Sequence, residues 1–192
     1  QRHALLGAVK GLSEGEILAF KGLGGCQLMV DATNGEVVQR LRLRKGRGNK
    51  PFALMFPTIQ AVQEAAVISD EERLLLESAE APIVLVEKKN ESFESAAPGN
   101  PYLGAFLPYT PLHYLLLDSF PFPLIVTSGN LSNEPICTTN DEAFGRLSHI
   151  ADSFLVHDRP IERPVDDSVV HWVAGKMQIL RRARGYAPLP IE

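Results

Sequence analysis

Short apolar runs separated by glycine, proline and polar residues predict a chain in which strands and helices alternate. Strands are expected at Glu16–Lys21, Cys26–Val30, Phe52–Phe56 and Ile83–Val86, because these runs are short, apolar and bounded by turn residues. Further along the chain, strands are expected at Leu103–Leu107, Leu124–Val126 and Phe154–Val156, the first of them at a sheet edge. Ser168–Val173 and Met177–Leu180 flank Gly175-Lys176 and predict a hairpin.

Helix-start signals lie between several of these runs. Thr33 or Asn34 is a candidate N-cap for a helix whose apolar face includes Val37, Val38 and Leu41, and Ser69 with Glu72 has the pattern of a capping box. Other helices are expected near 4–11, from Pro57-Thr58 to Val67, over Pro111–Asp118, and over Asp141–Leu147 with Asn140 as its cap. The polar segment Lys88–Gly99 is expected to be a surface loop or a mobile flap.

These elements predict the fold class: an α/β single domain over 1–192 with a twisted open mixed sheet, flanked by helices, in which antiparallel pairing appears late. No apolar run approaches the roughly 20 residues of a membrane helix, and the N-terminus lacks a signal-peptide pattern. The two cysteines, Cys26 and Cys137, have no metal-binding spacing, and no metal site is expected. A cytoplasmic protein that does not bind membranes is therefore expected.

The distribution of charge adds a candidate ligand. The formal net charge is −4, yet Arg40–Phe56 carries six basic residues and no acidic one. Gly46 and Gly48 interrupt the basic residues, and Pro51 restricts Lys50 to an extended conformation, so the segment is expected to run from a helix end through a tight loop into a strand. Such a loop gathers cations and backbone N–H groups as a polyphosphate requires. The alternative is a solvated basic helix end.

Three other motifs have both a structural and a functional interpretation. Lys21 precedes the glycine turn 22–25, which resembles a phosphate loop or is a plain tight turn. The stretch 127–130, Thr-Ser-Gly-Asn, offers short polar side chains after a strand, or a turn cap. Asp166-Asp167 is suited to bind Mg²⁺, to hold the arginines of 181–184, or simply to face solvent, and only part of that arginine cluster can point into one site.

Several of these segments together resemble the YrdC/Sua5 family, and within it the YrdC-like domain of the HypF hydrogenase maturation carbamoyltransferases. The matching segments, in family order, are FKGLGG (20–25), DATN (31–34), LRLRKGRGNKPFALM (41–55), LPYTPLHYLLL (107–117), TSGNLSNEPIC (127–137), HDRPI (157–161), DDSVV (166–170) and LRRARGYAP (180–188). They cover nearly the whole chain.

The resemblance implies a basic cavity that binds ATP with Mg²⁺ and forms carbamoyl-adenylate from carbamate derived from carbamoyl phosphate. It implies that Lys45, Arg47 and Lys50 contact the ATP phosphates, with Ser128, Asn130 and Arg181 beside the nucleotide. Lys21 and Thr110 are the residues expected at the carbamoyl end. The partner implied for the full protein is a HypE-like maturation protein that carries an acceptor thiol.

Two alternatives remain open at this point. The family cavity has also been viewed as a site for double-stranded RNA, and the related tRNA-modifying enzymes form threonylcarbamoyl-adenylate. Full-length carbamoyltransferases that resemble this chain also have acylphosphatase, zinc and transfer domains, which this sequence lacks. The chain is therefore expected to be either an excised domain or a stand-alone relative.

Overall fold

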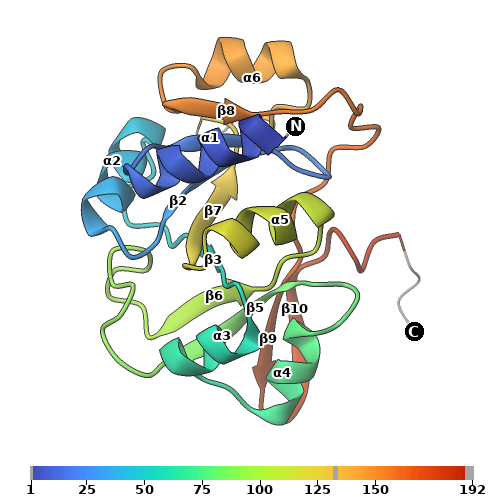
Figure 1. The fold of residues 1–192 in the computed structure, drawn as a ribbon. Helices are drawn as coiled ribbons and strands as arrows, with labels where there is room; N and C mark the ends of the chain where they lie inside the picture. Colours follow the sequence, from blue (N-terminus) through green and yellow to red (C-terminus); the bar gives the residue numbers. More distant parts are fainter. Residues whose placement is uncertain (1, 132–133, 189–192) are drawn as a thin grey trace.

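A mixed sheet that buries side chains on both faces is the centre of the structure, a computed structural model that describes residues 2–131 and 134–188 (Figure 1). The strands are β1 (Leu18–Lys21), β2 (Cys26–Asp31), β3 (Ala53–Met55), β4 (Ala66–Val67), β5 (Ile83–Lys88), β6 (Tyr102–Phe106), β7 (Leu124–Ser128), β8 (Ser153–Leu155), β9 (Val169–Val173) and β10 (Lys176–Arg181). The helices are α1 (Arg2–Ser13), α2 (Gly35–Lys45), α3 (Ile59–Ala65), α4 (Asp70–Leu76), α5 (Pro111–Ser119) and α6 (Asn140–Leu147).

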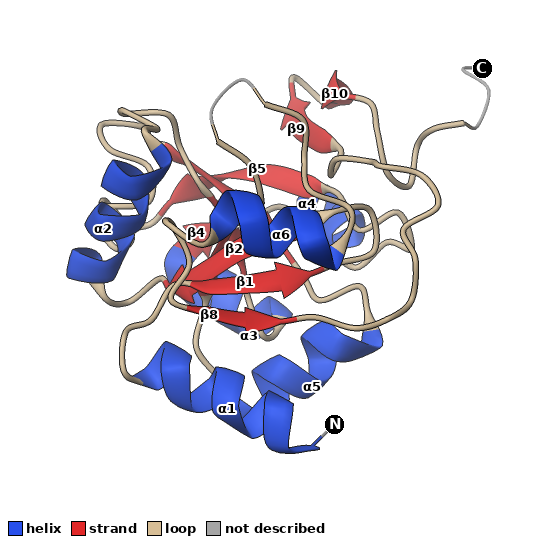
Figure 2. Ribbon diagram, turned by 90° about the horizontal axis from the view of Figure 1, so that it is seen from above, coloured by secondary structure: helices blue, strands red, loops and turns tan. Residues whose placement is uncertain are grey.

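Alternation along the strands divides the core into two layers. In β1, Leu18 and Phe20 pack with residues of α1 and α5, whereas Ala19 packs with residues of α2 and α6. Figure 2 shows α1 and α5 together on one side of the sheet and α6 on the other. Among the described residues the longest helix, α1, has 12 residues, and none is long and apolar enough to cross a bilayer.

The strand order is β10-β9-β5-β6-β3-β7-β2-β1-β8, with β4 pairing to β5 at the side. Three pairs are parallel (β1–β8, β3–β6 and β5–β9) and the others antiparallel, which confirms the predicted mixed sheet. Antiparallel pairing already begins with β1 and β2, so the expectation that it appears late was wrong. The edge assignment for 103–107 was also wrong, because β6 lies between β5 and β3.

Most predicted helix starts are confirmed. The Asn34 side chain caps α2 by accepting from the Val37 N–H at 3.2 Å, and Ser69 forms the capping box of α4 with Glu72. Two boundaries were wrong. Thr139, not Asn140, caps α6, and the helix expected to reach 67 ends at 65 because the next two residues pair with β5.

The segment 88–99 is less exposed than its polar sequence predicts. Lys88 belongs to β5, and Ala96 and Ala97 are completely buried. The Arg42 guanidinium donates to the carbonyls of Ser95 and Ala96 at 2.9 and 3.2 Å. These contacts fasten the polar loop to the end of α2, which is also where the basic loop begins.

Candidate functional site

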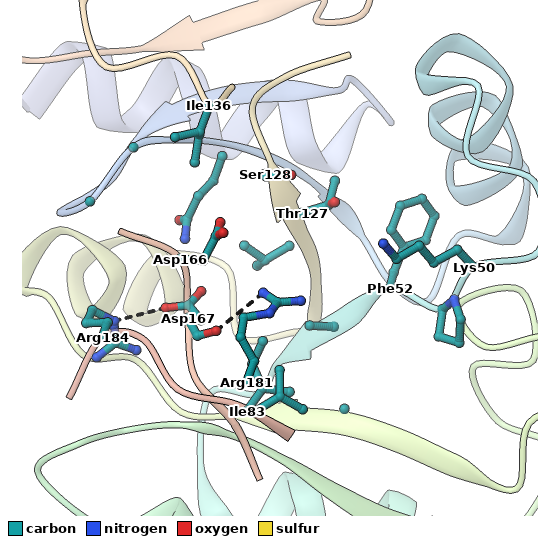
Figure 3. A pocket seen from close by; sticks show the side chains of 18 of the residues that line it. Lys50, Phe52, Ile83, Thr127, Ser128, Ile136, Asp166, Asp167, Arg181 and Arg184 are labelled. Atoms are coloured by element: carbon teal, nitrogen blue, oxygen red, sulfur yellow. Dashed lines mark hydrogen bonds and ion pairs between the residues drawn. The ribbon is translucent and has the colours of Figure 1, made fainter. Parts of the chain in front are cut away.

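A cavity of about 670 Å³ opens where the basic loop, the end of β7 and the C-terminal strands meet (Figure 3). Its polar lining consists of Gln27, Arg47, Lys50, Asn100, Tyr102, Tyr109, Thr127, Ser128, Asn130, Glu134, Asp166, Asp167, Arg181 and Arg184. Apolar lining comes from side chains such as Phe52, Ile83 and Ile136. The cavity therefore has the size and mixed lining of a small-molecule site.

The basic loop after α2 is built on a glycine and a buried arginine. Gly46 ends the helix at φ +62°, a left-handed conformation that glycine adopts without strain. The buried Arg42 guanidinium then donates to the carbonyls of Gly48 and Lys50 at 2.6 and 2.9 Å, in addition to its bonds to 95 and 96. In the sequence Arg42 is only one of six cations in this segment, whereas the structure shows that it shapes the loop.

Arg47 and Lys50 bring positive charge to the cavity from this loop. Arg47 Nη1 donates to Thr127 Oγ1 at 3.2 Å, Nη2 donates to the Pro51 carbonyl at 2.7 Å, and the guanidinium lies 4.7 Å from the centre of the Phe52 ring. Burial, together with the nearby arginines, lowers the pKa of Arg47 to about 10, so the group remains charged at neutral pH. Lys50 is exposed on the same side of the cavity as Phe52 (Figure 3).

Lys45 lies behind the cavity wall. Its side chain is buried, and Nζ donates to the carbonyls of Ser128 and Asn130, both at 2.6 Å, and to Asn130 Oδ1 at 3.0 Å. Ser128 Oγ donates to the same Asn130 Oδ1 at 2.7 Å. Gly129 is required in this turn, because a Cβ there would lie 2.7 Å from the Cys26 carbonyl oxygen. Lys45 therefore fixes the turn whose side chains, Ser128 and Asn130, line the cavity.

The charge on Lys45 makes stability depend on pH. Burial, with the nearby Arg47, lowers the pKa of Lys45 from 10.5 to about 8. Between these values the unfolded chain holds the proton more tightly than the folded chain, so the free energy of unfolding rises with pH across this window. Lys45→Met lacks this titrating group. We therefore expect the free energy of unfolding of wild type minus that of Lys45→Met, measured with denaturant, to be larger at pH 9.5 than at pH 7.5. An equal difference at both pH values would contradict this assignment.

Arg184 and Asp167 form a nearly buried ion pair at the opposite side of the cavity. Arg184 Nε lies 2.9 Å from Asp167 Oδ1, and its guanidinium also donates to the carbonyls of Glu80 and Ala81 and stacks 3.5 Å from the centre of the Tyr109 ring. Arg181 Nη1 donates to the Asp167 carbonyl at 3.3 Å and also lines the cavity. Of the alternatives for the aspartate pair, Asp167 therefore holds arginines.

Lys45, expected to contact the phosphates, is thus not part of the lining, and the structure separates two further expected site residues from the cavity. Lys21 is buried and its Nζ donates to the His157 carbonyl at 3.0 Å. Thr110 is the N-cap of α5, where its Oγ1 accepts from the His113 N–H. Neither residue is part of the lining, although the glycine turn after Lys21 contributes Gly24 and Gly25. The role expected for Lys21 and Thr110 at the carbamoyl end stays a prediction.

Three side chains that sequence analysis did not select complete the cavity near β2. Gln27 and Tyr109 line it, and the buried His113 lies directly behind Gln27, with His113 Nε2 3.3 Å from Gln27 Oε1. Burial lowers the pKa of His113 to about 3, so the imidazole is neutral. The sequence gives Gln27 no recognisable role, because a lone glutamine in an apolar strand has no local signal.

The described residues contain no cluster of three or more histidine, cysteine or carboxylate side chains that could hold a metal ion. They also contain no activated thiol, since burial raises the pKa of Cys26 to about 11. Residues 132 and 133 of the TSGNLSNEPIC stretch lie outside the described part of the chain. What the cavity offers chemically is fixed cations and hydrogen-bond donors around a space for a ligand.

Comparisons with known proteins agree on a family. A sequence model of the Sua5/YciO/YrdC family, described as "Telomere recombination", matches residues 10–183. Carbamoyltransferase HypF of Synechocystis sp. is 55% identical over 191 residues, which are 98% of this chain and 25% of that protein. HypF of Rhodobacter capsulatus is 50% identical over 182 residues, 92% of this chain and 24% of that protein. The chain thus spans about a quarter of the length of these relatives.

Solved structures show the same relationship. The crystal structure of full-length HypF in its phosphate- and nucleotide-bound form matches with a TM-score of 0.95 and 46% identity, over 98% of this chain and 30% of that one. Sua5 of P. abyssi complexed with L-threonine matches with a TM-score of 0.85 at 17% identity, over 95% and 55% of the two chains, which shows a shared fold. The chain therefore belongs to the Sua5/YciO/YrdC family, in which it closely matches the YrdC-like region of HypF carbamoyltransferases.

Proposed function

We propose that the cavity binds ATP and carbamate and forms carbamoyl-adenylate, with release of pyrophosphate. The observation that carries the proposal is the position of Arg47 and Lys50 beside the Ser128 turn on one side of a 670 Å³ cavity. A HypF chain 46% identical to this one has been crystallised with phosphate and nucleotide bound. Cations held on a rigid loop are what a triphosphate requires.

The residues present fit a nucleotide whose phosphates lie at the basic end. Arg42 and Lys45 hold the loop and the turn from behind, so Arg47, Lys50 and Ser128 are positioned before any ligand arrives. At the other end the charge of Arg184 is already paired with Asp167, so this pair offers no net positive charge to a phosphate. The charge distribution thus favours the orientation in which the phosphates of the nucleotide lie next to Arg47 and Lys50.

Mg²⁺ would be held mainly by the nucleotide itself. Protein sites commonly supply only one or two carboxylates to this ion, and substrate phosphates supply the rest. Asp166, which lines the cavity, is the carboxylate that fits this role. When bound, the ion would neutralise part of the charge on the phosphates.

The reaction needs little more than positioning and charge stabilisation. A carbamate oxygen forms a bond to the α-phosphorus while the bond between the α-phosphorus and the bridging oxygen to the β-phosphate breaks, and pyrophosphate leaves with the electron pair. Arg47 and Lys50 stabilise the negative charge that develops on this leaving group. No nucleophile from the protein is involved.

We propose further that the chain serves this step within [NiFe]-hydrogenase maturation, as the corresponding region of a HypF-like carbamoyltransferase. The adenylate would be the activated donor from which a carbamoyl group passes to an acceptor thiol on a maturation partner. The similarity to HypF over 98% of this chain supports this placement.

The test is exchange of labelled pyrophosphate into ATP by the purified chain with Mg²⁺ and freshly dissolved ammonium carbamate. We expect exchange that depends on carbamate and is absent with ammonium chloride. Exchange that requires L-threonine with bicarbonate instead would favour the threonylcarbamoyl alternative. The proposal would be overturned in favour of RNA binding if the chain showed neither exchange nor ATP binding, but bound duplex RNA with an affinity that falls steeply with salt.

A further inference from the structure

The sheet register places Gln27 beside Ser128 in the wall of the cavity. Gln27 pairs with Ser128 directly across the antiparallel ladder of β2 and β7. Paired residues project from the same face of a sheet with their Cβ atoms about 5 Å apart. Gln27 is therefore the neighbour of the turn that we assign to the phosphates, which is where an acyl group must lie to reach the α-phosphorus.

The Gln27 amide is held in one orientation from two sides. Its Nε2 donates to Tyr109 Oη at 3.1 Å, and its Oε1 lies 3.3 Å from His113 Nε2. His113 Nδ1 is buried without a partner among the described residues, so the single proton of the neutral ring is best placed on Nε2, where it is donated to Gln27. Tyr109 is itself fixed between the edge-on His113 ring, 4.7 Å away, and the Arg184 guanidinium.

This arrangement leaves one donor without a protein partner. Gln27 is only 7% exposed and lines the cavity, and among the described residues its Nε2 donates to Tyr109 alone. The second N–H of the amide is therefore directed by the same two anchors and remains for a ligand. A buried donor of this kind binds an acceptor oxygen strongly, since leaving it unpaired is costly.

The cavity wall near Gln27 is closely packed. Gly25 is part of this wall, and a Cβ on Gly25 would collide with the Ile136 side chain. A Cβ on Gly24 would likewise collide with Val165. Close packing on this side favours a small planar group over the two-ring adenine.

We infer that Gln27 binds the carboxylate oxygen of carbamate through its second amide N–H, with Tyr109 and His113 as positioning residues that hold the amide. This inference rests on the proposed function and names the residue that binds the acyl group in that reaction. It places that group on Gln27, in contrast to Lys21 and Thr110, whose side chains have partners outside the lining. The oxygen that does not attack phosphorus is the one that Gln27 would hold.

The experiment compares Gln27→Met with wild type in carbamate-dependent pyrophosphate exchange and in calorimetric titration with ATP. We expect the KM for carbamate to rise about ten- to hundredfold, because a hydrogen bond to a charged group is lost, while the Kd for ATP changes less than about twofold. Gln27→Glu, similar in shape but without the amide donor, should raise the KM for carbamate at least as much. Gln60→Met, at an exposed position of α3, is the matched control and should change neither value.

The role of Tyr109 in holding the Gln27 amide can be tested separately. Tyr109→Phe keeps the ring that stacks on Arg184 but removes the hydroxyl that accepts from Gln27. We expect it to raise the KM for carbamate with little change in the Kd for ATP. An unchanged KM for carbamate in both Gln27 variants would overturn the inference, as would a parallel loss of ATP affinity. If wild type shows no carbamate-dependent exchange, the proposed function fails and the inference fails with it.

Discussion

Arg47→Ala is expected to weaken ATP binding about a hundredfold, the largest effect on ligand affinity that the structure predicts. The guanidinium lines the cavity, remains charged at neutral pH, and is held by Thr127, Pro51 and the Phe52 ring in one orientation. A hydrogen bond to a charged group contributes about 1.5 to 3 kcal/mol, and removal of the side chain also frees the loop that carries Lys50. Calorimetric titration with ATP and Mg²⁺ measures the loss.

Two further variants make this prediction specific. Lys50→Ala, which removes an exposed cation from the same end of the cavity, should weaken ATP binding about tenfold because it loses charge without loosening the loop. Arg159→Ala removes an exposed arginine outside the lining and should leave ATP affinity unchanged. If Arg47→Ala and Lys50→Ala both bind ATP as wild type does, the phosphates do not lie at the basic end.

The largest effect on stability is expected from Arg184→Met. This side chain joins Asp167, the carbonyls of Glu80 and Ala81, and the face of the Tyr109 ring, and little of it reaches solvent. Removing one partner of a buried ion pair costs about 3 to 5 kcal/mol, because the other charge is left without compensation. Since a domain of this size has about 5 to 15 kcal/mol in total, the variant should lose a substantial part of its stability.

Denaturant unfolding, followed by circular dichroism, measures this loss for Arg184→Met. Arg159→Met is the matched control and should stay within about 0.5 kcal/mol of wild type, as exposed substitutions usually do. A double variant with Asp167→Asn should be less destabilised than the sum of the two single changes, because the uncompensated carboxylate is then absent. Additive losses would show that Arg184 acts through its other contacts.

The parts of this structure that depend on neighbours a few residues away follow from the sequence. The Asn34 cap, the capping box at Ser69 and the proline at the start of α5 each act within one helical turn, and each lies where it was expected. The basic loop is equally local, since Gly46 sets the turn and brings Arg47 and Lys50 into one short segment. Strand positions followed from apolar runs, and the family from ordered motifs.

What the tertiary structure decided depends on contacts between distant residues. Strand order decides that β6 lies inside the sheet and not at an edge. Packing decides that Lys45 points to the turn at Ser128 and not to solvent. The sequence pattern of each segment alone is compatible with either outcome. The bond between Gln27 and Tyr109 joins residues 82 positions apart, and the one between Arg184 and Ala81 joins residues 103 apart. No local preference acts over such separations. Only the register of β2 on β7 and the packing of α5 against the sheet bring Gln27, Tyr109 and His113 together into the polar wall of the cavity.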